Sequence, residues 1–270
     1  MECSLRGKLR RHRERILVGD RVWLQPIDWE HGTIERIMTR QTELLRPPIA
    51  NVDRVVLVCS LKDPPPDTWL LDRLLVLAAY YGVDSAICFN KSDLVSMTDA
   101  QYLMDLYSQA GFRVIATSIQ TPASVGCLSQ LLQDRVTVFA GMSGVGKSSL
   151  LNQIHPNLAL KTGPISEKSR RGRHTTRHLE LLSLDGGGLV ADSPGFSATD
   201  LPEIAPLELA SLFLEMKSLL GNCRFNSCSH QNEIGCAVRA AVHDRVIREE
   251  RYKHYLLMLE EIKRLAKNRY

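Results

Sequence analysis

The sequence contains no long hydrophobic run, and no apolar stretch approaches the roughly 18 residues that a membrane-spanning helix needs. The basic N-terminus also lacks the apolar stretch of a secretory signal peptide. The seven cysteines are odd in number, and without such a signal they do not indicate a disulfide framework. We therefore expect a cytoplasmic protein in a reducing compartment, with no membrane partner.

Internal repeats and low-complexity segments are absent too, and the composition is ordinary for a globular protein, with 44% apolar and 24% charged residues. The 270 residues fit one large domain or two to three small ones. The net charge of +4 does not by itself demand a nucleic-acid partner. Basic residues do gather in residues 1–15 and 161–177, where they suit a phosphate-rich surface or form a solvated face.

A phosphate-binding loop of the pattern G-x-x-x-x-G-K-[ST] lies in the middle of the chain. Glycines let backbone N–H groups converge on phosphate oxygens beside a helix N-terminus. Lys147 is expected to reach the terminal phosphates and assist catalysis, and Ser148 to offer its hydroxyl to Mg²⁺. The residues expected to bind nucleotide here are Gly141, Met142, Ser143, Gly144, Val145, Gly146, Lys147, Ser148 and Ser149.

A guanine-reading element, N-K-x-D, precedes this loop instead of following it. Asp93 can accept hydrogen bonds from both the ring N–H and the exocyclic amine of guanine, a donor pair that adenine lacks. Lys91 can lie along the base, and Asn90 can tie the loop together. Ser118 closes segment 116–118, which either supplies a backbone N–H to the guanine carbonyl or is an ordinary turn. The inverted order indicates a circularly permuted guanine-nucleotide domain.

A D-x-x-G element follows an apolar run near residue 190. Asp192 is expected to hold the Mg²⁺ shell, and the Gly195 amide to face the γ-phosphate. Between the two motifs, either Thr175 or Thr176 is expected to ligate Mg²⁺ in the triphosphate state.

The group that positions the attacking water is not where many such hydrolases carry it. Phe196 stands in the place of a water-positioning glutamine, and its side chain can neither donate nor accept a hydrogen bond. His174 is the candidate, because a neutral imidazole can hold or deprotonate water near neutral pH. The alternative is a histidine that only shapes the loop or contacts a partner.

Three cysteines and a histidine cluster within fourteen residues near the C-terminus, with the spacing C-x₄-C-x-H-x₅-C. Three thiolates and one imidazole match a closed, structural, tetrahedral zinc site. A redox pair is less favoured, because C-x-x-C is absent. The expected ligands of one zinc ion are Cys223, Cys228, His230 and Cys236.

Apolar runs alternate with helical patterns through the middle of the chain, which predicts a parallel sheet with helices on both faces. The expected strands are 54–60, 86–89, 113–116 and 135–140, and the expected helices are 67–82, 98–110, 124–132 and one from residue 147. A hairpin is expected over 178–191, short strands at 15–18 and 21–24, and helices at 206–220 and 238–267. Ligand loops belong at the carboxyl ends of the parallel strands.

Taken together, these motifs resemble the RsgA (YjeQ or YloQ) family of circularly permuted, ribosome-associated GTPases. The resemblance covers nearly the whole chain, from Leu5-Arg6-Gly7-Lys8 through both nucleotide motifs to the cysteine cluster. It implies an oligonucleotide-binding (OB) β-barrel at 1–50, a permuted P-loop α/β GTPase domain at 51–204 and a zinc-binding helical domain at 205–270. Family members usually carry further strands before the match to Cys3, so the barrel is expected to be incomplete or to close differently.

The resemblance also implies an activity and its partners. The chain would be a Mg²⁺-dependent GTP hydrolase that acts late in the assembly of the small (30S) ribosomal subunit, which would stimulate hydrolysis. Its partners would be that subunit, its rRNA and GTP or GDP, and we expect a monomer. The alternatives are a nucleotide-sensing RNA-binding module with incidental turnover, which Phe196 favours, and an ATPase, against which Asp93 argues.

Overall fold

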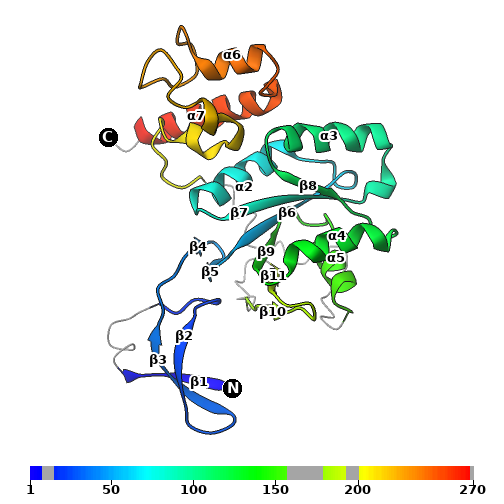
Figure 1. Cartoon of the computed structure of the whole chain (residues 1–270), viewed down its shortest axis with the longest axis vertical. Coiled ribbons are helices and arrows are strands. Elements are labelled where there is room, and N and C mark those ends of the chain that lie inside the picture. The colour runs from blue at the N-terminus through cyan, green and yellow to red at the C-terminus, as the bar shows by residue number, and fades with distance from the viewer. Residues whose placement is uncertain (8–14, 157–178, 193–200, 268–270) are drawn as a thin grey trace, which may run out of the picture.

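The computed structural model describes residues 1–7, 15–156, 179–192 and 201–267 (Figure 1). Its centre is a six-stranded sheet in the order β10-β11-β9-β6-β7-β8, in which every neighbouring pair is parallel except β10 with β11. The strands are β6 (Arg54–Ser60), β7 (Asp84–Asn90), β8 (Arg113–Ala116), β9 (Val136–Ala140), β10 (Leu182–Ser183) and β11 (Leu189–Asp192). Leu57 of β6 lies opposite Ile87 on one side and Ala140 on the other.

Helices cover both faces of this sheet, as predicted (Figure 1). One face packs against α2 (Thr68–Tyr80) and α3 (Met97–Gln109), and the other against α4 (Pro122–Leu132) and α5 (Lys147–Ile154). Side chains cap the first two helices: the Asp67 carboxylate accepts from Leu70 N–H, and the Ser96 hydroxyl accepts from Asp99 N–H. Each predicted helix of this region is confirmed to within a few residues.

The N-terminal region forms a separate three-stranded sheet, ordered β1-β3-β2, and a two-stranded hairpin. The strands are β1 (Glu2–Leu5), β2 (Val22–Pro26), β3 (His31–Ile37), β4 (Glu43–Leu45) and β5 (Pro48–Ala50). The strand expected at 15–18 is wrong, since only Val18 makes an isolated bridge, to Ile49. The reason is a local turn: the Asp20 carboxylate accepts from Leu17 N–H at 2.8 Å, and Asp20 N–H donates back to the Leu17 carbonyl.

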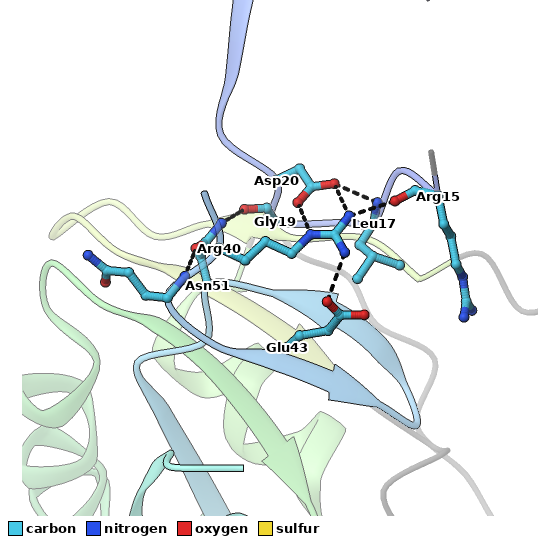
Figure 2. Close-up of polar contacts among 8 residues, drawn as sticks. Arg15, Leu17, Gly19, Asp20, Arg40, Glu43 and Asn51 are labelled. Carbon is cyan, nitrogen blue, oxygen red and sulfur yellow. Dashed lines mark hydrogen bonds and ion pairs between the residues drawn. The ribbon is translucent and has the colours of Figure 1, made fainter. Parts of the chain in front are cut away.

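Arg40 fixes this turn to the hairpin (Figure 2). Its guanidinium donates to both carboxylate oxygens of Asp20, at 2.7 and 2.9 Å, to Glu43 at 2.8 Å and to the Arg15 carbonyl at 2.6 Å. The Asp20 side chain is only 2% exposed, so its charge depends on this partner. Although burial raises the pKa of Asp20, the hydrogen bonds from Arg40 and Leu17 bring it below its usual value.

The C-terminal region is helical, but less regular than predicted. In place of one helix over 206–220 there are two 3₁₀ helices, η4 (Leu209–Leu212) and η5 (Leu214–Leu219), separated by an extended Phe213 whose ring packs edge-on against Tyr255. The helix expected over 238–267 is divided into α6 (Ala237–His243) and α7 (Glu249–Lys267). Between them Arg245 is left-handed, and two following N–H groups close on the Ala241 carbonyl. None of the helices in the described parts of the chain could span a bilayer.

Candidate nucleotide and metal sites

Four sequence motifs converge at one edge of the central sheet. The phosphate loop begins directly after β9, the guanine-reading loop after β7, and segment 117–118 after β8. Asp192 ends β11, opposite Phe139 of β9. Because these strands are parallel, their carboxyl ends lie at the same edge, which is the usual place for ligands in such sheets.

Two glycines of the phosphate loop allow close contacts with neighbouring strands. Gly141 has φ of 137°, and a Cβ there would lie 2.1 Å from the Val58 carbonyl oxygen. Gly146 has φ of 96°, and a Cβ there would lie 2.4 Å from the Asn90 side-chain nitrogen. The Lys147 ammonium donates to the carbonyls of Gly141 and Met142 at 2.8 Å each, which folds the cation back over the loop. Only glycine fits at positions 141 and 146.

The guanine-reading loop is bonded to the phosphate loop. The buried Asn90 side chain donates to the Val145 carbonyl at 2.8 Å and accepts from the Thr117 hydroxyl at 3.1 Å. Lys91, in the left-handed region with φ of 61°, donates to the Gly144 carbonyl at 2.8 Å and to the Asp63 carbonyl. The two loops therefore form one continuous site, although the chain reaches them in the inverted order.

The third loop differs from expectation by one residue. Thr117 N–H donates to the Phe89 carbonyl, and Ser118 N–H donates to the Ser124 hydroxyl at 3.0 Å. In the parts of the chain that the structure describes, the next N–H along, that of Ile119, donates no hydrogen bond. The Ser118 hydroxyl instead donates to the Asp93 carboxylate at 2.5 Å. The Ser118 hydroxyl thus orients the Asp93 carboxylate, and the Ile119 N–H is the available donor.

Several candidate residues lie outside the described parts of the chain. They are His174, Thr175, Thr176, Gly195 and Phe196. Asp192 is described only by its backbone, at the end of β11.

The cysteine-histidine cluster is assembled around the start of α6. The four candidate ligand atoms of Cys223, Cys228, His230 and Cys236 lie within 4.8 Å of one another. Nδ1 of His230 is 3.5 Å from the Cys223 sulfur and 3.4 Å from the Cys236 sulfur, and those two sulfurs are 4.0 Å apart. Such separations suit a tetrahedral ion with metal–ligand distances of about 2.0–2.3 Å. The residues present therefore fit a bound metal.

Backbone N–H groups and aromatic hydroxyls support the cysteine-histidine cluster. Ala237 N–H points at the Cys223 sulfur and Arg239 N–H at the Cys236 sulfur, at 3.4 and 3.5 Å. Tyr252 donates to the His230 carbonyl at 2.7 Å. Burial, with smaller contributions from the neighbouring thiols, raises the pKa of Cys228 to about 12. A cation is therefore needed to hold that sulfur as a thiolate near neutral pH.

Glu233 is a supporting residue that the sequence reasoning missed. Its carboxylate accepts from the N–H and hydroxyl of Ser229, at 2.7 Å each, and from the N–H groups of Gln231 and Asn232 at 2.9 and 3.0 Å. Burial raises its pKa, but these hydrogen bonds outweigh burial and bring the pKa to about 2. The only available signal was a lone acid among Ser, Gln and Asn between two predicted ligands.

We expect Glu233→Gln to loosen the loop around His230, because an amide cannot accept from all four donors. Supporting residues of this kind typically alter metal affinity by about 10- to 100-fold. Competition with a chromophoric zinc chelator would measure the change. Glu260→Gln, at an exposed position of α7 in the same C-terminal region, is the matched control and should leave metal affinity unchanged. Equal zinc affinity in both variants and the parent would contradict the role given to Glu233.

Comparison with known proteins finds a family model and curated relatives that carry the same family name. A family model described as RsgA GTPase matches residues 37–202. A curated protein of Moorella thermoacetica, named small ribosomal subunit biogenesis GTPase RsgA, is 48% identical over 96% of this chain and 89% of its own length. A protein of the same name from Caldanaerobacter subterraneus subsp. tengcongensis is 42% identical over 100% of this chain and 91% of its own.

Two solved structures are also similar. The crystal structure of YjeQ from Thermotoga maritima matches with a TM-score of 0.84 and 37% identity, covering 96% of this chain and 89% of that one. The structure of YloQ, described as a circularly permuted GTPase, matches with a TM-score of 0.82 and 39% identity, covering 97% and 85%.

Proposed function

Because this chain belongs to the RsgA family of GTPases, we propose that it hydrolyses GTP as a late assembly factor of the small ribosomal subunit. The observation that carries the proposal is the bonded pair of loops at the sheet edge, joined by the Asn90 side chain and the Val145 carbonyl. One loop has the chemistry to bind phosphate and the other to read guanine. The sequence predicts a circularly permuted domain, and the similar YloQ structure is described as a circularly permuted GTPase.

The roles of the binding residues follow from their contacts. Asp93, oriented by Ser118, would accept the two guanine donors, and the Ile119 N–H would donate to the guanine carbonyl. Lys91 would lie along the base, held by its two carbonyl partners. Lys147 would exchange its loop carbonyls for phosphate oxygens, because an ammonium group bonds charged acceptors more strongly than neutral carbonyls.

Hydrolysis would be in-line attack of water on the γ-phosphate. Lys147 and the loop amides would stabilise the charge that develops on the phosphoryl oxygens. Ser148, Asp192 and either Thr175 or Thr176 would hold Mg²⁺, which when bound neutralises phosphate charge. His174 would orient the water, because Phe196 offers no polar group. The Gly195 amide would face the γ-phosphate.

The flanking regions complete the proposal. Residues 1–50 would be an OB-like domain that binds rRNA, 51–204 the GTPase domain, and 205–270 a domain held together by one structural zinc ion. The two small sheets of the first region support the first assignment, as does the bridge from Val18 to Ile49 of β5, and the ligand geometry supports the zinc. The protein would act as a cytoplasmic monomer.

Titration of GTPase activity with purified small ribosomal subunits tests the function. We expect turnover to rise with subunit concentration, and His174→Ala to reduce the stimulated rate by about 100-fold or more, in the range of a positioned acid or base, without weakening GTP binding. Tight GTP binding with no stimulation would favour the nucleotide-sensing module instead. Full stimulated turnover in His174→Ala would remove His174 from catalysis.

A further inference from the structure

A buried ion-pair cluster joins α2 to α7. Helix α2 begins beside the sheet edge that carries the nucleotide motifs, and α7 belongs to the metal-bearing region, which is the helical C-terminal region with the cysteine-histidine cluster. Arg251 of α7 is 2% exposed; its guanidinium donates to Asp72 of α2 at 2.5 Å and to Glu215 of η5 at 2.7 and 3.0 Å. The other carboxylate oxygen of Asp72 lies 2.6 Å from Nδ1 of His254. Both oxygens of Asp72 are therefore bound by residues of α7.

Aromatic rings enclose the charged groups of this cluster. The rings of Tyr107, Phe112 and Phe213 lie 5.5, 5.4 and 5.1 Å from the guanidinium carbon of Arg251. Asp72 is fully buried, so it cannot exchange Arg251 for water unless the helices separate. The cluster therefore fixes α2 against α7 in one position.

The N-terminal end of α2, where Asp72 lies, leads directly to the nucleotide site. The helix begins after Asp67, five residues before Asp72, or roughly 7 Å along the helix axis. Residues 61–66 connect β6 to this end. Within that connection, the Asp63 carbonyl accepts from the Lys91 ammonium, and the Pro64 ring lies 3.8 Å from the place of a Cβ on Gly144. Loop 61–66 thus contacts both the guanine-reading loop and the phosphate loop.

We propose that Asp72, held by its ion pair with Arg251, is a positioning residue for guanine-nucleotide binding. The inference rests on the function proposed above. Asp72 fixes α2, α2 fixes loop 61–66, and the Asp63 carbonyl holds Lys91 in the place where it lies along the base. If α2 shifts, Lys91 loses one of its two carbonyl partners and the base loses an ordered neighbour. The metal-bearing region thereby contributes to nucleotide affinity without touching the nucleotide.

Two isosteric variants test this inference. Each replaces one of the two carboxylates that bind Arg251 with a neutral amide, but only one of these carboxylates, that of Asp72, lies on α2. Asp72→Asn is expected to weaken GDP binding by about tenfold, the effect of one hydrogen bond to a charged group, mainly through faster dissociation. Glu215→Gln leaves the Asp72 contact in place and should change GDP affinity by less than about twofold. Both variants should lower the thermal unfolding midpoint. Fluorescent GDP binding and stopped-flow dissociation supply the readouts.

Tyr102→Phe is a second control, since the Tyr102 hydroxyl of α3 also bonds α7, at Glu250, but does not act through α2. Its GDP affinity should equal that of the parent. Should Asp72→Asn fail to fold, Arg251→Lys takes its place with the same expected loss. The inference is overturned if Asp72→Asn binds GDP as tightly as the parent does. It is also overturned if Glu215→Gln loses as much GDP affinity as Asp72→Asn. Absence of GDP binding by the parent protein would instead overturn the proposed function.

Discussion

Replacing Asp93 with asparagine is expected to weaken GDP binding by roughly 100-fold or more. Two hydrogen bonds to a charged acceptor are at stake, each contributing on the order of 1.5–3 kcal/mol. The amide nitrogen would also face the guanine amine, donor against donor. Xanthine carries a carbonyl where guanine carries that amine, so Asp93→Asn should gain relative affinity for xanthosine diphosphate. Titration calorimetry with both nucleotides measures the change.

The control for Asp93→Asn is Asp105→Asn, which removes the same charge from α3 away from the loop. It should bind GDP like the parent. Ser118→Ala should give a smaller loss than Asp93→Asn, because Ser118 only orients the carboxylate that meets the base. An unchanged preference for GDP over xanthosine diphosphate in Asp93→Asn would refute the base-reading assignment.

Loss of the metal is expected to unfold the C-terminal region. Structural zinc contributes about 10–16 kcal/mol of apparent binding free energy near neutral pH, which is as large as the total stability of a typical domain. Cys236→Ser removes one of the four candidate ligands, whereas its hydroxyl can still cap the first turn of α6. We expect this variant to bind no stoichiometric zinc and to lose helical circular dichroism; a strong chelator should do the same to the parent.

Cys127→Ser supplies the matched control, because Cys127 is an exposed cysteine on α4, far from the cluster in sequence. It should retain one zinc ion per chain and unfold like the parent. Elemental analysis and thermal denaturation distinguish the two. One bound zinc and a parental melting curve in Cys236→Ser would show that the cluster does not need metal.

The placement of the described nucleotide motifs at one sheet edge was predictable because each motif stands beside a short, buried strand. Asn90 and Gly141 follow apolar runs that could only be interior strands, and parallel strands bring their carboxyl ends together. The spacing of the metal ligands was equally informative, since the liganding segment is local in the chain. Patterns within about fourteen residues therefore located the chemistry without any knowledge of tertiary contacts.

The parts that could not be predicted depend on contacts between distant segments or on single turns. Asp72 and Arg251 are 179 residues apart, and either could have been an ordinary exposed charge on its helix. The shift of the free donor from Ser118 to Ile119 arises from one hydrogen bond of Ser124. The strand expected at 15–18 was lost to a turn closed by Asp20, because a side-chain acceptor there competes with strand pairing.

The contact between Gly146 and Asn90 has a consequence for how such a sequence can change over generations. No side chain fits at position 146 while Asn90 keeps its amide 2.4 Å from the place of a Cβ. The side chain at 90 in turn needs the Val145 carbonyl as its acceptor. Glycine at 146 is required both by its positive φ and by this contact, so descendants of this chain should keep the glycine together with Asn90. Asn90 and Val145 are 55 residues apart in the sequence, yet through this contact each of the two loops limits which substitutions the other can accept.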